Sequence, residues 1–106
     1  MEWIKVFSNG GDMRERLQEG IPQQATVGGK NICLVLWKGD LRALENKCPH
    51  NGEWLSKGTV NFLGEGVCPW HGYRFRLSTG REGNERCRDA EIFPVRENDE
   101  GFFVGL

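Results

Sequence analysis

The longest apolar run of the chain, ICLVLW at residues 32–37, lies between two glycine turns. Its residues are rich in strand formers and show no apolar–polar alternation, which is typical of a strand buried on both faces. Gly28-Gly29 before the run and Lys38-Gly39-Asp40 after it each predict a turn. We therefore expect a strand over residues 31–37 at the centre of two consecutive hairpins between residues 23 and 46.

Strand and turn signals continue toward both ends of the chain. Fifteen glycines in 106 residues, about twice the average share, agree with many tight turns. One short helix is expected over residues 13–19, with Asp12 as its N-cap. Pro94 has no amide hydrogen to donate, so it belongs at a sheet edge or a bulge. Further strands are expected at residues 3–7, 41–46, 91–97 and 102–106.

The middle of the chain differs from its ends. Residues 47–81 hold both histidines, two of the four cysteines and six of the glycines. Strand signals in this segment are short, around residues 66–68 and 73–76. We expect a single antiparallel all-β domain, in which a base of residues 1–46 and 82–106 carries the middle segment as a small inserted lobe.

Charge and hydropathy narrow the possible partners. The formal net charge is −1 with both signs interspersed, so no basic surface for nucleic acid is expected. The start, MEWIK, has no basic stretch followed by an apolar run, and an apolar run of six residues is far too short to span a bilayer. We expect a soluble, cytoplasmic protein without membrane contact. In a reducing compartment, a cysteine beside a histidine is more often a metal ligand than half of a disulfide.

Both histidines of the chain stand beside a cysteine. The pattern is Cys48-x-His50, then residues 51–67, then Cys68-x-x-His71. A zinc site for one ion usually keeps like ligands together, with a cysteine pair followed by a histidine pair. Here each segment offers one thiolate and one imidazole, which favours a binuclear centre with thiolates on one metal and imidazoles on the other. A zinc site with the same four ligands, or two ordinary surface histidines, are the alternatives.

The segments CPHNGEWLSKG and CPWHGYRFRLSTG resemble the two cluster-binding loops of the Rieske family. The resemblance covers most of the chain, since the hairpins before the loops and the closing strands agree with the family's all-β fold. Gly52 and Gly72 lack a Cβ, so the backbone can turn sharply and approach the sulfurs of a cluster. The matching residues are Cys48, His50, Gly52, Leu55, Ser56, Gly58, Cys68, Pro69, Trp70, His71, Gly72, Phe75, Thr79 and Gly80.

The resemblance implies a ligand set for one [2Fe–2S] cluster per chain. Cys48 and Cys68 would hold the buried iron. His50 and His71 would hold the outer iron, near the surface where an electron can leave. Because neutral imidazoles replace negative thiolates, adding an electron becomes easier and the potential rises above that of an all-cysteine ferredoxin.

Four positions depart from the respiratory Rieske proteins of cytochrome bc complexes. Those proteins have a disulfide at the positions of Glu53 and Trp70, so this disulfide cannot form here. They also place hydroxyls that donate to the sulfurs at the positions of Tyr73 and Phe75, and Phe75 has no donor. Fewer donors and the nearby Glu53 carboxylate leave a reduced cluster less stabilised. We expect a potential near the bottom of the family's range of about −150 to +300 mV.

The other cysteines and the charged segment have simpler interpretations. Cys33 lies in the most apolar strand and is expected to be an inert core thiol. Cys87 stands in a charged loop and is expected to be an exposed spare, with a disulfide to Cys33 as the alternative. Residues 81–91 are most simply a solvated loop. Trp70 is expected to shield the cluster, with core packing as the alternative.

The expected function follows from the cluster and from the small number of histidines. Rieske oxygenases add a non-haem iron held by two further histidines and a carboxylate, and this chain has only two histidines. We therefore expect no enzyme, but a soluble Rieske-type ferredoxin that passes single electrons from a reductase to a terminal oxygenase or other oxidoreductase. A small non-catalytic Rieske subunit of a larger oxidoreductase, similar to that of nitrite reductases, is the alternative. A zinc-binding interaction module is the third hypothesis.

Overall fold

The apolar run lies on β3 (Lys30–Trp37), inside a four-stranded antiparallel sheet of the computed structural model, which describes all of residues 1–106. Residues 32–36 are all buried, which confirms the prediction of a strand covered on both faces. Both predicted hairpins are confirmed, because β3 pairs antiparallel with the strand on each side of it. The order of the sheet is β2 (Gln23–Val27), β3, β4 (Asp40–Glu45) and β8 (Ile92–Phe93).

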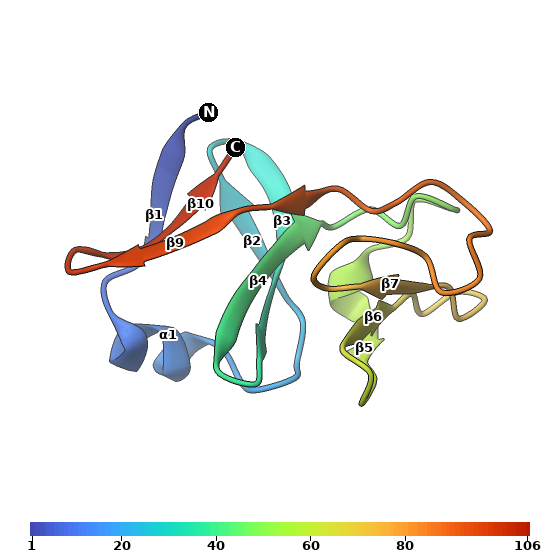
Figure 1. Cartoon of the computed structure of the whole chain (residues 1–106), viewed down its shortest axis with the longest axis horizontal. Helices are drawn as coiled ribbons and strands as arrows, with labels where there is room; N and C mark the ends of the chain where they lie inside the picture. The colour runs from blue at the N-terminus through green and yellow to red at the C-terminus, as the bar shows by residue number, and fades with distance from the viewer.

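The two ends of the chain pair in a second sheet. Its order is β1 (Trp3–Phe7), β10 (Gly101–Gly105) and β9 (Val95–Asn98). Antiparallel pairing of β1 with β10 brings the two termini to the same end of the molecule (Figure 1). The strand expected over residues 91–97 is divided, because Pro94 separates β8 in the first sheet from β9 in the second.

The one α-helix, α1 (Gly10–Arg16), begins before the predicted start at residue 13. Asn9 is the N-cap, and its side chain accepts a hydrogen bond from the Asp12 amide at 2.8 Å. Asp12 lies in the first turn, where its carboxylate accepts from the Ser8 amide at 2.9 Å. The prediction of Asp12 as the cap was wrong, because both residue types cap helices and the local pattern does not say which one meets a free amide.

A third, small sheet lies to one side of the other two (Figure 1, right). It consists of β5 (Thr59–Val60), β6 (Glu65–Val67) and β7 (Arg74–Arg76). β6 and β7 confirm the short strands expected in the middle segment, whereas the sequence does not predict β5 or the short 3₁₀ helix η1 (Leu55–Lys57). The antiparallel all-β fold is therefore confirmed, and the boundaries between base and lobe at 46/47 and 81/82 stay a prediction.

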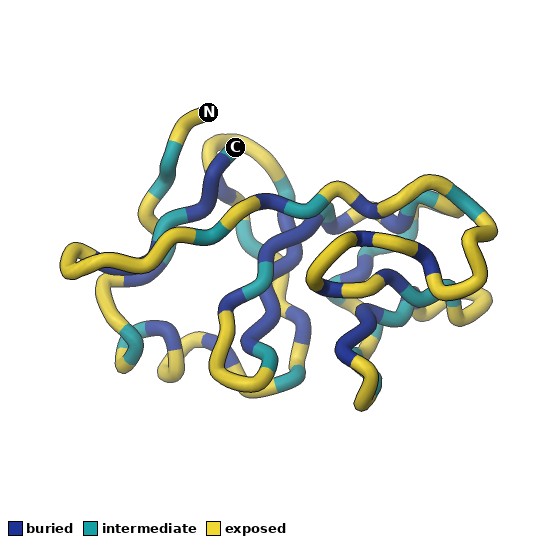
Figure 2. The backbone as a smooth tube through the Cα atoms, viewed as in Figure 1, coloured by how far each residue is buried: buried dark blue, intermediate teal, exposed yellow.

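Two apolar cores meet at β3, whose alternate side chains point to opposite faces. Ile32, Leu34 and Leu36 belong to a first core shared with α1 and the second sheet. Cys33 and Val35 belong to a second core, which extends under the middle segment. Figure 2 shows the buried stretches along β3 and β4 and the exposed tips of the turns. No helix of the chain combines the length and the apolar character needed to cross a bilayer.

Candidate functional site

Two loops carry the cysteines and histidines, and backbone hydrogen bonds close each of them. In the first loop, which follows β4, the Cys48 amide donates to the Glu53 carbonyl at 2.7 Å. The Gly52 amide donates to the Cys48 carbonyl at 2.8 Å. In the second loop, between β6 and β7, the Cys68 amide donates to the Tyr73 carbonyl at 2.8 Å. Each loop is therefore a tight turn that begins at a cysteine.

Both turns contain a residue in the left-handed region. Gly52 has a φ of 78° and Gly72 a φ of 66°, where residues with a Cβ are disfavoured by about 1–2 kcal/mol. A Cβ added to either glycine would meet no protein atom within 4 Å. Glycine is therefore favoured here by the backbone conformation and not by the space that neighbouring residues leave. The expected sharp turn is confirmed, and the approach of these glycines to cluster sulfurs stays a prediction. His71 has a φ of 65°, which is uncommon for a residue with a side chain.

The structure places the four candidate ligands as an inner pair and an outer pair. Cys48 and Cys68 are 2% and 1% exposed. His50 and His71 are both exposed, and 5.9 Å separates their ring centroids. Burial raises the pKa of the Cys68 thiol, and the neighbouring Cys48 thiol raises it further. The two loops thus meet with thiols inside and imidazoles outside.

This donor set fits the metal group that the sequence predicts. Nowhere in the chain do three or more His, Cys, Asp or Glu side chains gather as the ligands of one metal ion. Two pairs of different chemistry are present instead, soft thiols within and imidazoles at the surface. Such a division suits a [2Fe–2S] cluster in which two histidines replace two cysteines on one iron. Ligation by these four residues stays a prediction.

Asn51, between His50 and Gly52, contributes a buried polar group that the sequence does not single out. Its Oδ1 accepts a hydrogen bond from the Glu53 amide at 2.9 Å and lies 3.8 Å from the Cys68 Sγ. Its Nδ2 is shielded from solvent and has no acceptor in the protein. A buried amide donor in a loop that carries two candidate ligands is consistent with a group that accepts hydrogen bonds there.

Tyr73 packs against one of the two exposed histidines, His50. Its ring is stacked on the His50 ring, with 3.8 Å between centroids and 9° between planes. The Arg86 guanidinium carbon also lies 3.8 Å from the Tyr73 centroid. Because two planar groups at this distance cannot share one face, Tyr73 lies between His50 and Arg86. Phe75, the other position at which the respiratory members carry a hydroxyl, has none and is fully buried in the second core.

Glu82 anchors the segment that the sequence suggests is a solvated loop. Its side chain is fully buried, and it accepts hydrogen bonds from Arg86 Nε at 2.9 Å and from an Arg86 terminal nitrogen at 2.7 Å. The backbone amides of Arg74, Asn84 and Arg86 also donate to it. Hydrogen bonds from Arg86 hold the pKa of this carboxyl well below its usual range. The expectation of a fully solvated loop is wrong at Glu82, because the carboxylate collects donors from residues that surround it.

The two other cysteines are both free, so the alternative of a Cys33–Cys87 disulfide is wrong. Cys33 is 1% exposed on β3, and burial raises the pKa of its thiol to about 12. The prediction of a core thiol is confirmed, and its inertness stays a prediction. Cys87 is half-buried against the second core, so the expectation of an exposed spare is wrong. Its partial burial arises from the fold of the loop around Glu82, which a charged local sequence does not reveal.

Trp70 lies at the surface of the second loop. It is 59% exposed, which excludes core packing, and its ring lies 6.0 Å from that of His71. Phe62 and Leu63, between β5 and β6, are also exposed apolar residues. Apolar side chains are therefore presented to solvent in the same segment as the exposed imidazoles.

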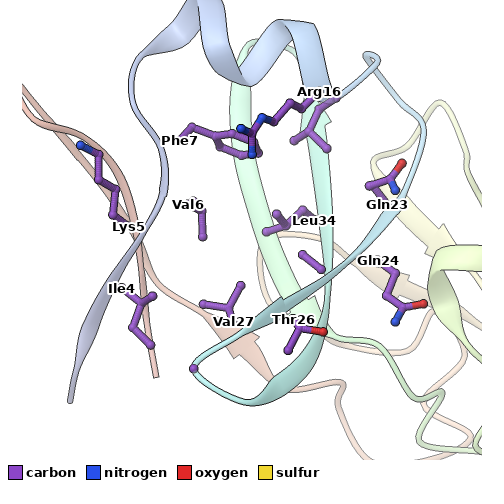
Figure 3. Close-up of a pocket in the computed structure, with 13 residues that line it drawn as sticks. Ile4, Lys5, Val6, Phe7, Arg16, Gln23, Gln24, Thr26, Val27 and Leu34 are labelled. Atoms are coloured by element: carbon purple, nitrogen blue, oxygen red, sulfur yellow. The ribbon is translucent and has the colours of Figure 1, made fainter.

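A cavity in the base is separate from this site. It has a volume of about 370 Å³ and lies among β1, α1 and β2, as Figure 3 shows. Phe7, Arg16, Val27 and Leu34 are among the residues that line it. None of its lining residues belongs to the two loops. The candidate site is thus a surface arrangement over buried thiols, away from this cavity.

Comparisons with known sequences point to one family. The family model described as the Rieske [2Fe-2S] domain matches residues 5–95. Apoptosis-inducing factor 3 of Mus musculus and of Homo sapiens is 38% identical over 90 residues, and the match covers 85% of this chain but only 13% of each of those proteins. The ferredoxin component of naphthalene 1,2-dioxygenase/salicylate 5-hydroxylase systems from a Ralstonia species is 31% identical over 81 residues. That match covers 76% of this chain and 77% of the Ralstonia protein.

Solved structures have the same fold. The ferredoxin of carbazole 1,9a-dioxygenase from Nocardioides aromaticivorans IC177 superposes with a TM-score of 0.82 at 22% identity, over 99% of this chain and 98% of that one. Dicamba monooxygenase gives a TM-score of 0.78 at 26% identity, over 97% of this chain and 33% of that one. The whole chain therefore has the architecture of these proteins or of one part of them.

Proposed function

Because the chain belongs to the Rieske [2Fe–2S] domain family, we propose that it is a soluble ferredoxin that carries single electrons on one [2Fe–2S] cluster. The observation that carries the proposal is the division of the candidate ligands into two buried thiols and two exposed imidazoles. The Ralstonia relative is a ferredoxin component and is matched over 77% of its length, which supports a carrier of this size. A single domain with its cluster lobe at residues 47–81 is part of the proposal.

The ligands in this proposal are the four residues that the sequence predicts. Cys48 and Cys68 hold the inner iron, and their burial keeps water away from it. His50 and His71 hold the outer iron and are exposed. The bound cluster supplies a centre that accepts and releases one electron. Cysteines bind metal as thiolates, so the raised pKa of Cys68 means that loading releases a proton from this residue.

Electron transfer to and from partners is proposed to occur through the exposed histidines. A reductase supplies the electron, and a terminal oxygenase or another oxidoreductase accepts it. The chain has only two histidines, and the proposal uses both as cluster ligands. None is left for the two-histidine iron site of an oxygenase, so the chain is proposed to be a carrier and no enzyme. A cytoplasmic location stays a prediction.

The second candidate is a Rieske domain that serves a larger oxidoreductase. The match to apoptosis-inducing factor 3 favours it, because the matched region is only 13% of each of those proteins. Exposed Trp70, Phe62 and Leu63 would suit a permanent partner surface. Stable co-purification with one large subunit supports this candidate, whereas a monomer that exchanges electrons with separate partners supports the ferredoxin.

The first experiment is an anaerobic purification with metal and sulfide analysis. We expect a red-brown protein with about two irons and two acid-labile sulfides per chain, and a Rieske-type electron paramagnetic resonance (EPR) signal after reduction. Reduced protein mixed with an aromatic-ring oxygenase and its substrate should be oxidised within one turnover. A colourless protein that binds zinc after anaerobic reconstitution with iron and sulfide would contradict the proposal.

A further inference from the structure

Asn51 has a buried side-chain amide in the loop that carries Cys48 and His50. The Nδ2 atom is shielded from solvent, and no protein group accepts its hydrogens. The other end of the same amide, Oδ1, lies 3.8 Å from the Cys68 Sγ. Only one other buried side-chain nitrogen in the chain has no acceptor, Nε of Arg42 on β4. Buried donors without a partner are rare in proteins, so this one requires an explanation.

The orientation of the amide follows from its oxygen. Oδ1 accepts the Glu53 backbone hydrogen at 2.9 Å, and only the oxygen of an asparagine amide can accept. The flipped orientation would place two donors against each other. Nδ2 is therefore the free end of the Asn51 amide.

Binding of the cluster changes Cys68 from a hydrogen-bond donor into an acceptor. In the metal-free protein, the Cys68 thiol donates weakly to Oδ1 across 3.8 Å. A cysteine that binds iron is a thiolate and has no hydrogen to donate. Thiolate and sulfide sulfurs instead accept hydrogen bonds, and Asn51 Nδ2 is a donor without another partner in this region.

We propose that the Asn51 side-chain amide donates a hydrogen bond to a sulfur of the [2Fe–2S] cluster. The inference rests on the proposed function, since it needs the cluster to be bound by the two loops. A reduced cluster is more negative than an oxidised one, so a donor to sulfur stabilises the reduced form and raises the potential. Asn51 thereby supplies part of the stabilisation that hydroxyl donors give in the respiratory members, and that Phe75 cannot give.

The first test compares Asn51→Leu with Asn98→Leu. Asn98 is a matched control, because its Oδ1 also accepts the amide of the residue two positions later, Glu100, at 2.8 Å in an exposed turn. For Asn51→Leu we expect the redox equilibrium to shift about tenfold toward the oxidised form, which is 59 mV for a one-electron couple, at unchanged iron and sulfide content. Asn98→Leu should have the wild-type potential. Equal potentials in all three proteins would overturn the inference.

The second test does not depend on a variant that folds. Wild-type protein is labelled with asparagine that carries ¹⁵N only in the side-chain amide, reduced, and measured by pulsed EPR. We expect a ¹⁵N coupling to the cluster spin, present also in labelled Asn98→Leu. The absence of this coupling in a protein with an intact Rieske-type signal would overturn the inference about Asn51 and leave the proposed function standing. The absence of a Rieske-type signal would instead overturn the proposed function.

Discussion

The ring of Tyr73 lies flat on the ring of His50, with 3.8 Å between the two centroids. On its other face, Tyr73 is covered by Arg86, which the buried Glu82 holds through two hydrogen bonds. A buried carboxylate is thus linked to one exposed imidazole through two side chains, those of Arg86 and Tyr73. His71 has no such support, since no ring is stacked on it: the ring of the exposed Trp70 is tilted by 59° and that of His50 by 79°.

The first prediction concerns the orientation of His50. Arg86→Gln removes the guanidinium group that covers Tyr73, together with the two hydrogen bonds that this group donates to Glu82. Because the hydrogen bonds to buried Glu82 are lost, we expect a melting temperature lower by about 4–8 °C. Because the His50 ring is held less firmly without the guanidinium on Tyr73, we also expect a broader EPR signal of the reduced cluster. Arg88→Gln is the control, since Arg88 pairs with Glu45 at 2.6 Å and is mostly exposed. Equal line widths in the two variants would show that Arg86 does not position His50.

The second prediction concerns stability and pH. Glu82→Gln should lower the free energy of unfolding by about 1–3 kcal/mol at pH 7, because charge-assisted hydrogen bonds to a buried group are lost. The folded-state pKa of Glu82 is held below its unfolded value of about 4.3, so its stabilisation is complete above that pH. As pH falls toward the folded-state pKa, the stabilisation is lost.

Urea denaturation of the metal-free protein between about pH 3 and pH 7 measures this difference. We expect the stability gap between wild type and Glu82→Gln to be constant near neutrality and to shrink below about pH 4. Glu85→Gln is the control, since Glu85 pairs with Arg81 in an exposed position. A gap that does not change with pH would contradict the account of Glu82.

The third prediction concerns the outer iron. His71→Cys should retain part of the cluster but lower its potential by at least 59 mV, a tenfold shift, because a thiolate adds negative charge. His50→Cys should change the potential in the same direction and lose more cluster, because the stacking on Tyr73 is also removed. Redox titration and iron analysis of both variants measure this. A potential that rises in His71→Cys would count against His71 as a ligand.

The fourth prediction concerns the potential of the wild-type protein. Phe75 is fully buried and has no hydroxyl to donate to a sulfur, and Glu53 adds negative charge beside the first loop. We expect a midpoint in the lower part of the family's range of about −150 to +300 mV, with Asn51 keeping it from the lowest values. Voltammetry of purified protein decides the point, and a midpoint above about +100 mV would contradict the prediction.

Local patterns were sufficient for the strands and for the position of the two loops. The run at 32–37 predicts β3 because apolar periodicity and glycine turns are properties of neighbouring residues. The Cys and His spacing predicts the site for the same reason. The predicted start of α1 was wrong because Asn9 and Asp12 are both residue types that cap helices, and only the folded backbone decides between them.

The sequence by itself determined the all-β class, the Rieske family and the four candidate ligands, since each depends on residue type and spacing. The tertiary structure alone decided that Glu82 is buried, that Tyr73 lies between Arg86 and His50, and that the Asn51 amide has a free donor. The physical reason is that a polar group is buried only where partners satisfy it, and these partners come from separate segments of the chain. The burial of a polar residue therefore cannot be predicted from the charged or polar residues next to it in the sequence.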